Sequence, residues 1–302
     1  MIFVAIMNIC FAAALPLLKI ALGYTDPMSM VAMRMLLGGG LLLAYAAIFE
    51  RIPAWRTVPW RLIMVTALFE VYILCLGEAW ALERMSAAQA SIMWSLLPLI
   101  TACIVRVFQS KSISLLQVSA IIIAMAGSYT LIDNPRFLIS GWSVTGLPEG
   151  VMFLAVCSAA YGYILLEQLA CEMQSVIVSS GLMMVVGGFG SLITGIMYQG
   201  VEPLSDAVCN QTLWIVMIGI VILENIIGLT LQTLLTRRFS ATFLALSSFI
   251  TPLSGVFMGV WFLGEPWYSR YGGALGCILC AILLFYQEEI RKLIVDGTQQ
   301  IG

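Results

Sequence analysis

The sequence predicts an all-α, polytopic membrane protein of ten transmembrane helices, arranged as two inverted repeats of five helices each. Three observations lead to this fold class. Of the 302 residues, 61% are hydrophobic and only 10% are charged, whereas about a quarter of the residues in a soluble protein are charged. The apolar residues come in long blocks, each about the 20 residues that a helix needs to cross hydrocarbon. Parts of the two halves also match at one fixed offset.

Charged residues, Gly and Pro bound the apolar blocks. Most connections between blocks are only a few residues long, so consecutive helices should be antiparallel neighbours. The first block begins at Met1 without a basic segment or cleavage site, which predicts a retained span rather than a signal peptide. The expected spans are 2–22, 27–49, 60–82, 86–108, 113–132, 148–169, 174–198, 211–235, 239–263 and 268–287.

The longest connection separates two units of similar size. We expect a first repeat at 1–133, an extracytoplasmic connecting loop at 134–147, a second repeat at 148–287 and a cytoplasmic tail at 288–302. A shift of 154 residues places Arg84-Met85-Ser86-Ala87 on Arg238-Phe239-Ser240-Ala241 and Pro98 on Pro252. Because each half has an odd number of spans, the second half should enter the membrane from the opposite side. Inverted repeats of this kind place a ligand site near the bilayer midplane.

The distribution of Lys and Arg predicts the orientation, because basic loops stay in the cytoplasm. A cytoplasmic N-terminus places nine basic residues on the cytoplasmic side and three on the other. The nine are Arg51, Arg56, Arg61, Arg106, Lys111, Arg237, Arg238, Arg291 and Lys292, and the three are Arg84, Arg136 and Arg270. Both termini are therefore expected in the cytoplasm, with the chain in a bacterial inner membrane.

Charge and residue usage exclude several classes of function. The formal charge of −2 and the scattered basic residues give no footprint for nucleic acid. The chain has no His, so Ser-His and Cys-His catalysis and the commonest metal ligand are absent. The eight Cys mostly lie in apolar blocks and are expected to be reduced and buried. We therefore expect no enzyme, no metal and no cofactor.

Two acidic residues lie near mid-depth in equivalent spans. Glu70 is about ten residues into the third span and Glu224 about thirteen into the eighth, and the 154-residue shift superimposes them. Two carboxyls that share a dry cavity cannot both ionise cheaply, so the pair would hold a proton or attract a cation. The alternative is that each is protonated and bonds a neighbouring helix as structural support.

Three other ionisable residues, Lys19, Arg34 and Glu78, are expected in the outer half of the membrane. An ion cluster there would serve as an extracytoplasmic gate that opens and closes during a transport cycle. The alternative is a permanent structural pair, with Lys19 extending towards the interface.

Further residues at matching depth are candidates for the wall of a central site. Trp94 and Tyr161 would supply aromatic faces, which suit a cation. For each candidate, packing between helices is the alternative. Pro98 and Pro252 interrupt equivalent spans and would form a symmetric hinge. The polar candidates are Gln232, Asn8 and Ser91.

Two segments resemble the EamA-type repeats of the drug/metabolite transporter (DMT) superfamily. One runs from Ala81 to Ala90 and on to Leu97-Pro98-Leu99, and the other runs from Ser240 through Thr251-Pro252 to Pro266. The resemblance implies ten helices with both ends inside, a central cavity and alternating access. Members include amino-acid and metabolite exporters, permeases for nucleoside-like cofactors and S-adenosylmethionine carriers.

The chain departs from the family pattern at two places. Ser110-Lys111 replaces the Gly-Glu that the family has after its fourth span, whereas Gly264-Glu265 keeps it after the ninth. Glu70 and Glu224 are not part of the generic family pattern, which suggests that they serve this carrier's own substrate.

These features predict a secondary transporter of a small polar metabolite with a cationic group, such as an amino acid, an amine or S-adenosylmethionine. Transport would use alternating access with proton coupling or substrate exchange, as in an antiporter. The expected partners are the substrate and the lipid bilayer, with the chain as a monomer or homodimer. Two other functions remain open: a lipid-linked-sugar flippase of similar fold, and a membrane-embedded enzyme.

Overall fold

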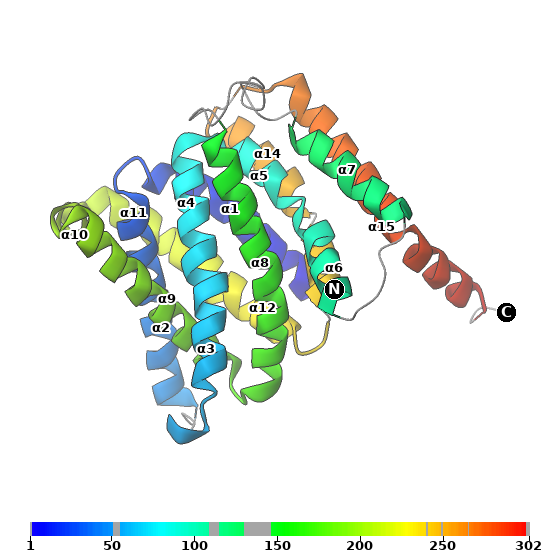
Figure 1. Cartoon of the computed structure of the whole chain (residues 1–302). Helices are drawn as coiled ribbons and strands as arrows, with labels where there is room; N and C mark the ends of the chain where they lie inside the picture. Colours follow the sequence, from blue (N-terminus) through cyan, green and yellow to red (C-terminus); the bar gives the residue numbers. More distant parts are fainter. Residues whose placement is uncertain are drawn as a thin grey trace.

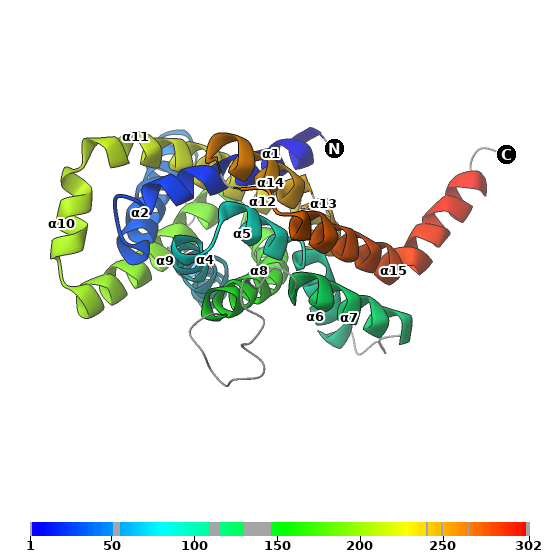
Figure 2. The same ribbon diagram turned by 90° about the horizontal axis from the view of Figure 1, so that it is seen from above.

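All the secondary structure that the computed structural model describes is helical (Figures 1 and 2). The structure describes residues 2–50, 55–108, 115–129, 146–239, 241–248, 250–264 and 266–299. Within these residues, seven helices are long and apolar enough to cross a membrane. They are Ile2–Ala21, Pro27–Phe49, Trp60–Arg84, Ala87–Val107, Leu147–Glu172, Val176–Gln199 and Gln211–Leu235. An all-α membrane fold is thus supported, while the ten spans and the inversion stay predictions.

The described residues of the first half form seven α-helices and two other helical segments. α1 and α2 are single helices, and the third expected span is a continuous run of α3, η2 and α4. Their bounds are α1 Ile2–Ala21, α2 Pro27–Phe49, η1 Trp55–Thr57, α3 Trp60–Thr66, η2 Ala67–Ile73, α4 Leu74–Arg84, α5 Ala87–Trp94, α6 Leu97–Phe108 and α7 Leu115–Tyr129.

The described residues of the second half form helices in a similar order, and they include a short helix, α10, that the sequence did not predict. The helix α15 also continues to Gln299, so part of the expected tail is helical. Residues 134–145 of the expected connecting loop lie outside the described residues. The bounds are α8 Leu147–Glu172, α9 Val176–Gln199, α10 Glu202–Cys209, α11 Gln211–Ile220, η4 Val221–Leu229, α12 Thr230–Leu235, α13 Ala241–Ser247, α14 Ile250–Phe262 and α15 Ser269–Gln299.

Local sequence explains where these helices begin and where two of them break. Asp26 caps α2 by accepting hydrogen bonds from the backbone N–H groups of Met28 and Ser29 at 2.9 and 3.0 Å. A proline clashes with the carbonyl four residues before it, and α5 ends at Trp94, four residues before Pro98. α13 likewise ends at Ser247, five residues before Pro252. The expected interruptions are present, and hinge motion at them stays a prediction.

Most of the larger helix contacts recur when each expected span is exchanged for its counterpart in the other half. α2 packs along α9, α5 against α14, and α7 beside α15 (Figures 1 and 2). The contact of α4 with α8 corresponds to that of α1 with η4. Glycines permit the closest approach, because a Cβ on Gly39 of α2 would lie 2.8 Å from the carbonyl oxygen of Gly181 in α9.

The third and eighth expected spans match in finer detail. Each contains one π-helical segment, η2 and η4, and the two segments begin 154 residues apart. Every position from 60 to 79 is buried, half-buried or exposed in the same way as the position 154 residues later, from 214 to 233. These two segments carry Glu70 and Glu224, so the repeated structure positions both carboxyls.

Candidate functional site

A cavity lies among helices from both halves of the chain. The empty space of the cavity and its mouth is about 670 Å³. The space that the centre of a water-sized sphere can occupy is smaller, about 70 Å³. That is room for several waters, so a larger ligand would require side chains or helices to move. The lining residues are Phe11, Leu15, Leu18, Glu70, Leu74, Cys75, Glu78, Trp94, Leu97, Tyr163, Glu224, Leu229, Gln232 and Ser248.

The wall of the cavity is strongly acidic for a buried site. Glu70, Glu78 and Glu224 all line it and are at most 7% exposed. One cation, Arg34 of α2, is fully buried beside them. If all four groups are ionised, the site carries a net charge of −2, which favours a cationic ligand.

We name the first group of residues the arginine pole; Glu224, Glu78 and Trp94 line the cavity, and Arg34 is buried against Glu224. Arg34 Nη1 lies 2.5 Å from Glu224 Oε1, and Trp94 Nε1 donates a hydrogen bond of 2.8 Å to Glu78 Oε1. Glu78 also interacts electrostatically with Arg34 and Glu224. Among the described residues, Nε and Nη2 of Arg34 and Oε2 of Glu224 are buried without a hydrogen-bond partner. This pole therefore retains donors and an acceptor for a ligand.

We call the second part the glutamine pole; it consists of Glu70 and Gln232. Gln232 Nε2 donates a hydrogen bond of 2.7 Å to Glu70 Oε1. Glu70 Oε2 is buried and has no hydrogen-bond partner in the described part of the chain. It lies against Gly162 of α8, where a Cβ would occupy the position of this oxygen. The described salt bridges do not include Glu70, so its charge would be uncompensated.

The two poles occupy equivalent positions in the two halves. The 154-residue shift places Glu70 on Glu224 and Glu78 on Gln232. The contact between Glu70 and Gln232 thus corresponds to the approach of Glu224 to Glu78. One backbone arrangement therefore carries two different sets of side chains.

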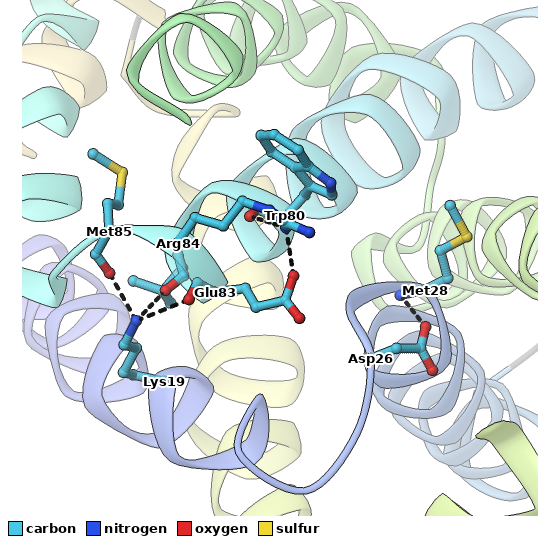
Figure 3. A network of polar contacts seen from close by, with 8 residues as sticks. Lys19, Asp26, Met28, Trp80, Glu83, Arg84 and Met85 are labelled. Atoms are coloured by element: carbon cyan, nitrogen blue, oxygen red, sulfur yellow. Dashed lines mark hydrogen bonds and ion pairs between the residues drawn. The ribbon is translucent and has the colours of Figure 1, made fainter. Parts of the chain in front are cut away.

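Lys19 joins α1 to the end of α4 (Figure 3). Its Nζ donates hydrogen bonds to the carbonyl oxygens of Leu82 and Met85 at 2.5 and 2.8 Å. Carbonyls at a helix C-terminus lack helical partners and attract cations. Beside them Arg84 pairs with Glu83 and stacks over the Trp80 ring. We name the contact of Lys19 with residues 82–85 the α4 clasp.

Arg237 makes the corresponding contact at the end of α8. Its Nε and Nη2 donate to the carbonyl oxygens of Ala170, Met173 and Gln174 at 3.0, 2.5 and 2.8 Å. The shift of 154 residues places residue 19 on 173 and residue 83 on 237. The first span is thus joined to the third, and the sixth span is joined to the eighth. Lys19 belongs to the first span of its pair, whereas Arg237 follows the second span of its pair. We name this contact the α8 clasp; α4 and α8 end at opposite ends of the bundle (Figure 1).

The structure brings together four of the seven residues that the sequence suggested for binding or proton coupling: Glu70, Glu224, Trp94 and Gln232 line the cavity. Asn8, Ser91 and Tyr161 are not among the lining residues. Asn8 donates to the carbonyl oxygen of Val4 at 2.9 Å, and Ser91 is fully buried. Tyr161 packs its ring edge-on against Phe69.

The three residues expected to form an outer gate are not one cluster. Arg34 and Glu78 belong to the arginine pole, whereas Lys19 forms the α4 clasp. Arg34 pairs with a carboxylate from the other half of the chain, which the sequence did not indicate. A role for these residues in gating stays a prediction.

Tyr163 lines the cavity in the place expected for Tyr161. Two residues turn an α-helix by about 200°, so the two tyrosines lie on nearly opposite faces of α8. The sequence does contain a signal for the correct face. The small residues Ala155, Ala159 and Gly162 follow each other at helical spacing and mark the face that packs against other helices.

Comparison with known proteins finds similarity over nearly the whole chain. The model of the EamA-like transporter family matches residues 1–132 and 148–287. A S-adenosylmethionine/S-adenosylhomocysteine transporter of Chlamydia muridarum (strain MoPn / Nigg) is 28% identical over 302 residues, covering 96% of this chain and 93% of that protein. The protein of the same name from Chlamydia trachomatis serovar L2 is also 28% identical, with 96% and 90% covered. A solved crystal structure, 15% identical, superimposes with a TM-score of 0.67 over 96% of this chain and 97% of that chain.

Proposed function

Because the chain belongs to the EamA-like transporter family, we propose that it is a secondary carrier of S-adenosylmethionine that exchanges it for S-adenosylhomocysteine or couples its movement to protons. The family is one of transporters, so the chain is a membrane-embedded carrier of a small molecule and not an enzyme. The substrate is the step that we add. It rests on the relatives' names and on the acidic cavity.

The observation that carries the substrate proposal is a cavity lined by three carboxyls, with one guanidinium buried against Glu224. S-adenosylmethionine has a sulfonium, an ammonium and a carboxylate, and therefore a net charge of +1. Glu78 and the indole of Trp94 would face the sulfonium, because a carboxylate and an aromatic ring both favour a cation. The unused donors of Arg34 would bind the carboxylate.

The proposed carrier has ten spans in two inverted repeats, both termini in the cytoplasm and the bacterial inner membrane as its location. The preserved packing pattern and the matched burial of residues 60–79 and 214–233 support this arrangement. The bias of basic residues supports the orientation. A monomer or a homodimer would both suit it.

Alternating access would use the two clasps. With Lys19 and Arg237 both engaged, each end of the bundle is tied and the substrate is enclosed. Release of the α4 clasp would open the cavity at one end, and release of the α8 clasp would open it at the other. The helix breaks before Pro98 and Pro252 would supply the hinges.

Uptake into proteoliposomes tests the proposal. The wild type should accumulate labelled S-adenosylmethionine, and preloaded S-adenosylhomocysteine or a pH gradient should accelerate uptake. Glu70→Gln, Glu78→Gln and Glu224→Gln should each lower uptake by about ten-fold, the effect of losing one charge-assisted contact. Glu202→Gln, at an exposed carboxyl of α10, is the matched control. Normal uptake by all three cavity variants would show that the carboxyls do not bind the substrate.

Labelling of Cys75, which lines the cavity, tests the clasps. In a protein whose other seven cysteines are replaced, Lys19→Met should expose Cys75 to an impermeant maleimide from the outside. Arg237→Met should expose it from the cytoplasmic side. Equal labelling of both variants from one side would rule out this assignment of the two ends.

A further inference from the structure

The buried positions of the two carboxyl-bearing helices recur every four residues. They are 66/67, 70/71, 74/75 and 78/79 in the first half, and 220/221, 224/225, 228/229 and 232/233 in the second. In a regular α-helix, four residues turn by about 400°, which exceeds a full turn by about 40°. Over three steps of four residues, the buried face would therefore rotate about the helix axis by about 120°. The observed face stays buried throughout. Something in both helices must therefore remove this rotation.

The π-helical segments η2 and η4 lie within these stretches and account for the difference. A π turn accommodates about one more residue than an α turn. One extra residue removes about 100° of rotation, close to the 120° that has to be absorbed. Glu70 and Glu224 are each the fourth residue of their segment, so part of each π-helical segment lies between this carboxyl and the residue eight positions later.

This change of register decides which side chains reach the cavity. Glu78 follows Glu70 by eight residues, and Gln232 follows Glu224 by eight. Residues eight apart in a regular α-helix point about 80° away from each other, whereas one extra residue reduces this angle to about 20°. All four side chains line the same cavity. In a regular α-helix, Gly77 and Leu231 would face it instead.

We propose that the extra residue held in η2 and in η4 is a positioning element of the binding site. It keeps Glu78 and Gln232 on the face of Glu70 and Glu224, and so completes both poles. The inference rests on the proposed function only in taking this cavity as the substrate site. The register itself is tested without substrate.

Cross-linking between positions 70 and 232, whose side chains Glu70 and Gln232 are in contact at 2.7 Å, tests the register. In a cysteine-free background, the pair Glu70→Cys and Gln232→Cys should react with a short bifunctional thiol reagent. The pair Glu70→Cys and Leu231→Cys should react at least about ten-fold more slowly, because residue 231 points about 100° away. These substitutions leave the length of the helix unchanged. Equal rates for the two pairs would overturn the inference.

Variants of altered length, made in the parent with Glu70→Cys and Gln232→Cys, test the extra residue. Deletion of Ile227 should give a regular α-helix in which the two introduced thiols still face each other, and cross-linking should stay within about three-fold of the parent. Insertion of one Ala after Ile227 should rotate the second thiol by about 100° and lower the rate by about ten-fold or more. Faster cross-linking in the insertion than in the deletion would overturn the proposal. So would misfolding of the deletion alone, measured by size exclusion.

Binding of S-adenosylmethionine to the same length variants, with Glu70 and Gln232 restored, separates this inference from the proposed function. The deletion should bind within about three-fold of the wild type, and the insertion about ten-fold more weakly. If the wild type itself does not bind S-adenosylmethionine while the cross-linking pattern holds, the substrate proposal fails and the register stands. If the wild type binds S-adenosylmethionine but the cross-linking pattern does not hold, the substrate proposal stands and the positioning role is wrong.

Discussion

The two poles of the cavity are built on equivalent backbone positions and differ in one respect that decides their chemistry. In the arginine pole, Glu224 pairs with Arg34 at 2.5 Å. In the glutamine pole, the neutral amide of Gln232 donates to Glu70 at 2.7 Å, and the described residues place no cation against this carboxyl. The first pole has a buried cation that a carboxylate must balance. The second has a carboxyl that a proton or a bound cation must balance.

This difference shows how two structurally matched helical segments can carry different chemistry. The burial of residues 60–79 and 214–233 is the same, yet the side chains 154 residues apart are Glu78 and Gln232. Two differences between the halves separate an ion-pair site from a neutral site: α9 has no counterpart of Arg34, and Gln232 stands where the first half has Glu78. A substrate with several charged groups would then bind in one orientation.

Removal of the cation should have the largest effect. In Arg34→Met, Glu224 becomes a buried carboxylate without a partner, which costs about 3–5 kcal/mol of the free energy of unfolding. Replacement of both members, Arg34→Met with Glu224→Met, should recover most of this stability but not transport. Denaturant unfolding in detergent, followed by circular dichroism, measures the difference. Equal stability of Arg34→Met and the wild type would show that the ion pair contributes nothing to the fold.

The same residues show how much of this site the sequence predicts. Hydropathy places the helices well, because an unpaired charge in hydrocarbon is costly and marks the interior of the bundle. Glu70 and Glu224 are found in this way, and Trp94 and Gln232 are found from their depth in the spans and their positions in the repeat. Depth along a helix does not fix rotation about its axis, so the sequence favours Tyr161 although Tyr163 lines the cavity.

The partner of Arg34 required the tertiary structure. Along the sequence, Arg34 lies at the depth of Lys19 and Glu78, and nothing local favours Glu224 from the other half. Lys19 instead meets the end of α4. The π turns of η2 and η4 were also beyond prediction from local propensity, although the spacing of Glu224, Gly228 and Gln232 by four residues was visible. A repeated spacing of four residues is the sequence pattern that we expect for a buried helix face with one extra residue.

Gly162→Ala should damage the glutamine pole alone. A Cβ at this position would occupy the place of Glu70 Oε2, so the carboxyl must move at a cost of about 1–3 kcal/mol. Binding of S-adenosylmethionine should weaken by about ten-fold, which is about 1.4 kcal/mol. The matched control is Gly150→Ala on the same helix, where a Cβ would meet nothing within 4 Å.

Isothermal titration of both glycine variants measures this effect. We expect the arginine pole to be unaffected. The double variant Gly162→Ala with Glu70→Ala should unfold no more easily than Glu70→Ala alone, because the carboxyl oxygen that the added Cβ would overlap is then absent. Weakening of the same size in Gly150→Ala would assign the loss to helix packing rather than to Glu70.

Trp94→Phe should produce the smallest change, and only in the arginine pole. The aromatic face remains, but the hydrogen bond of 2.8 Å to Glu78 is lost, and a bond to a charged group contributes about 1.5–3 kcal/mol when both partners are held. Glu78 lines the cavity and can reach water there, so the net loss should be about 1 kcal/mol, or five-fold in affinity. Titration of the sulfonium S-adenosylmethionine and the neutral thioether S-adenosylhomocysteine distinguishes the two contributions of Trp94. A loss confined to the sulfonium would mean that the indole orients Glu78 towards this charge, whereas an equal loss for both ligands would mean that Trp94 acts only as a wall.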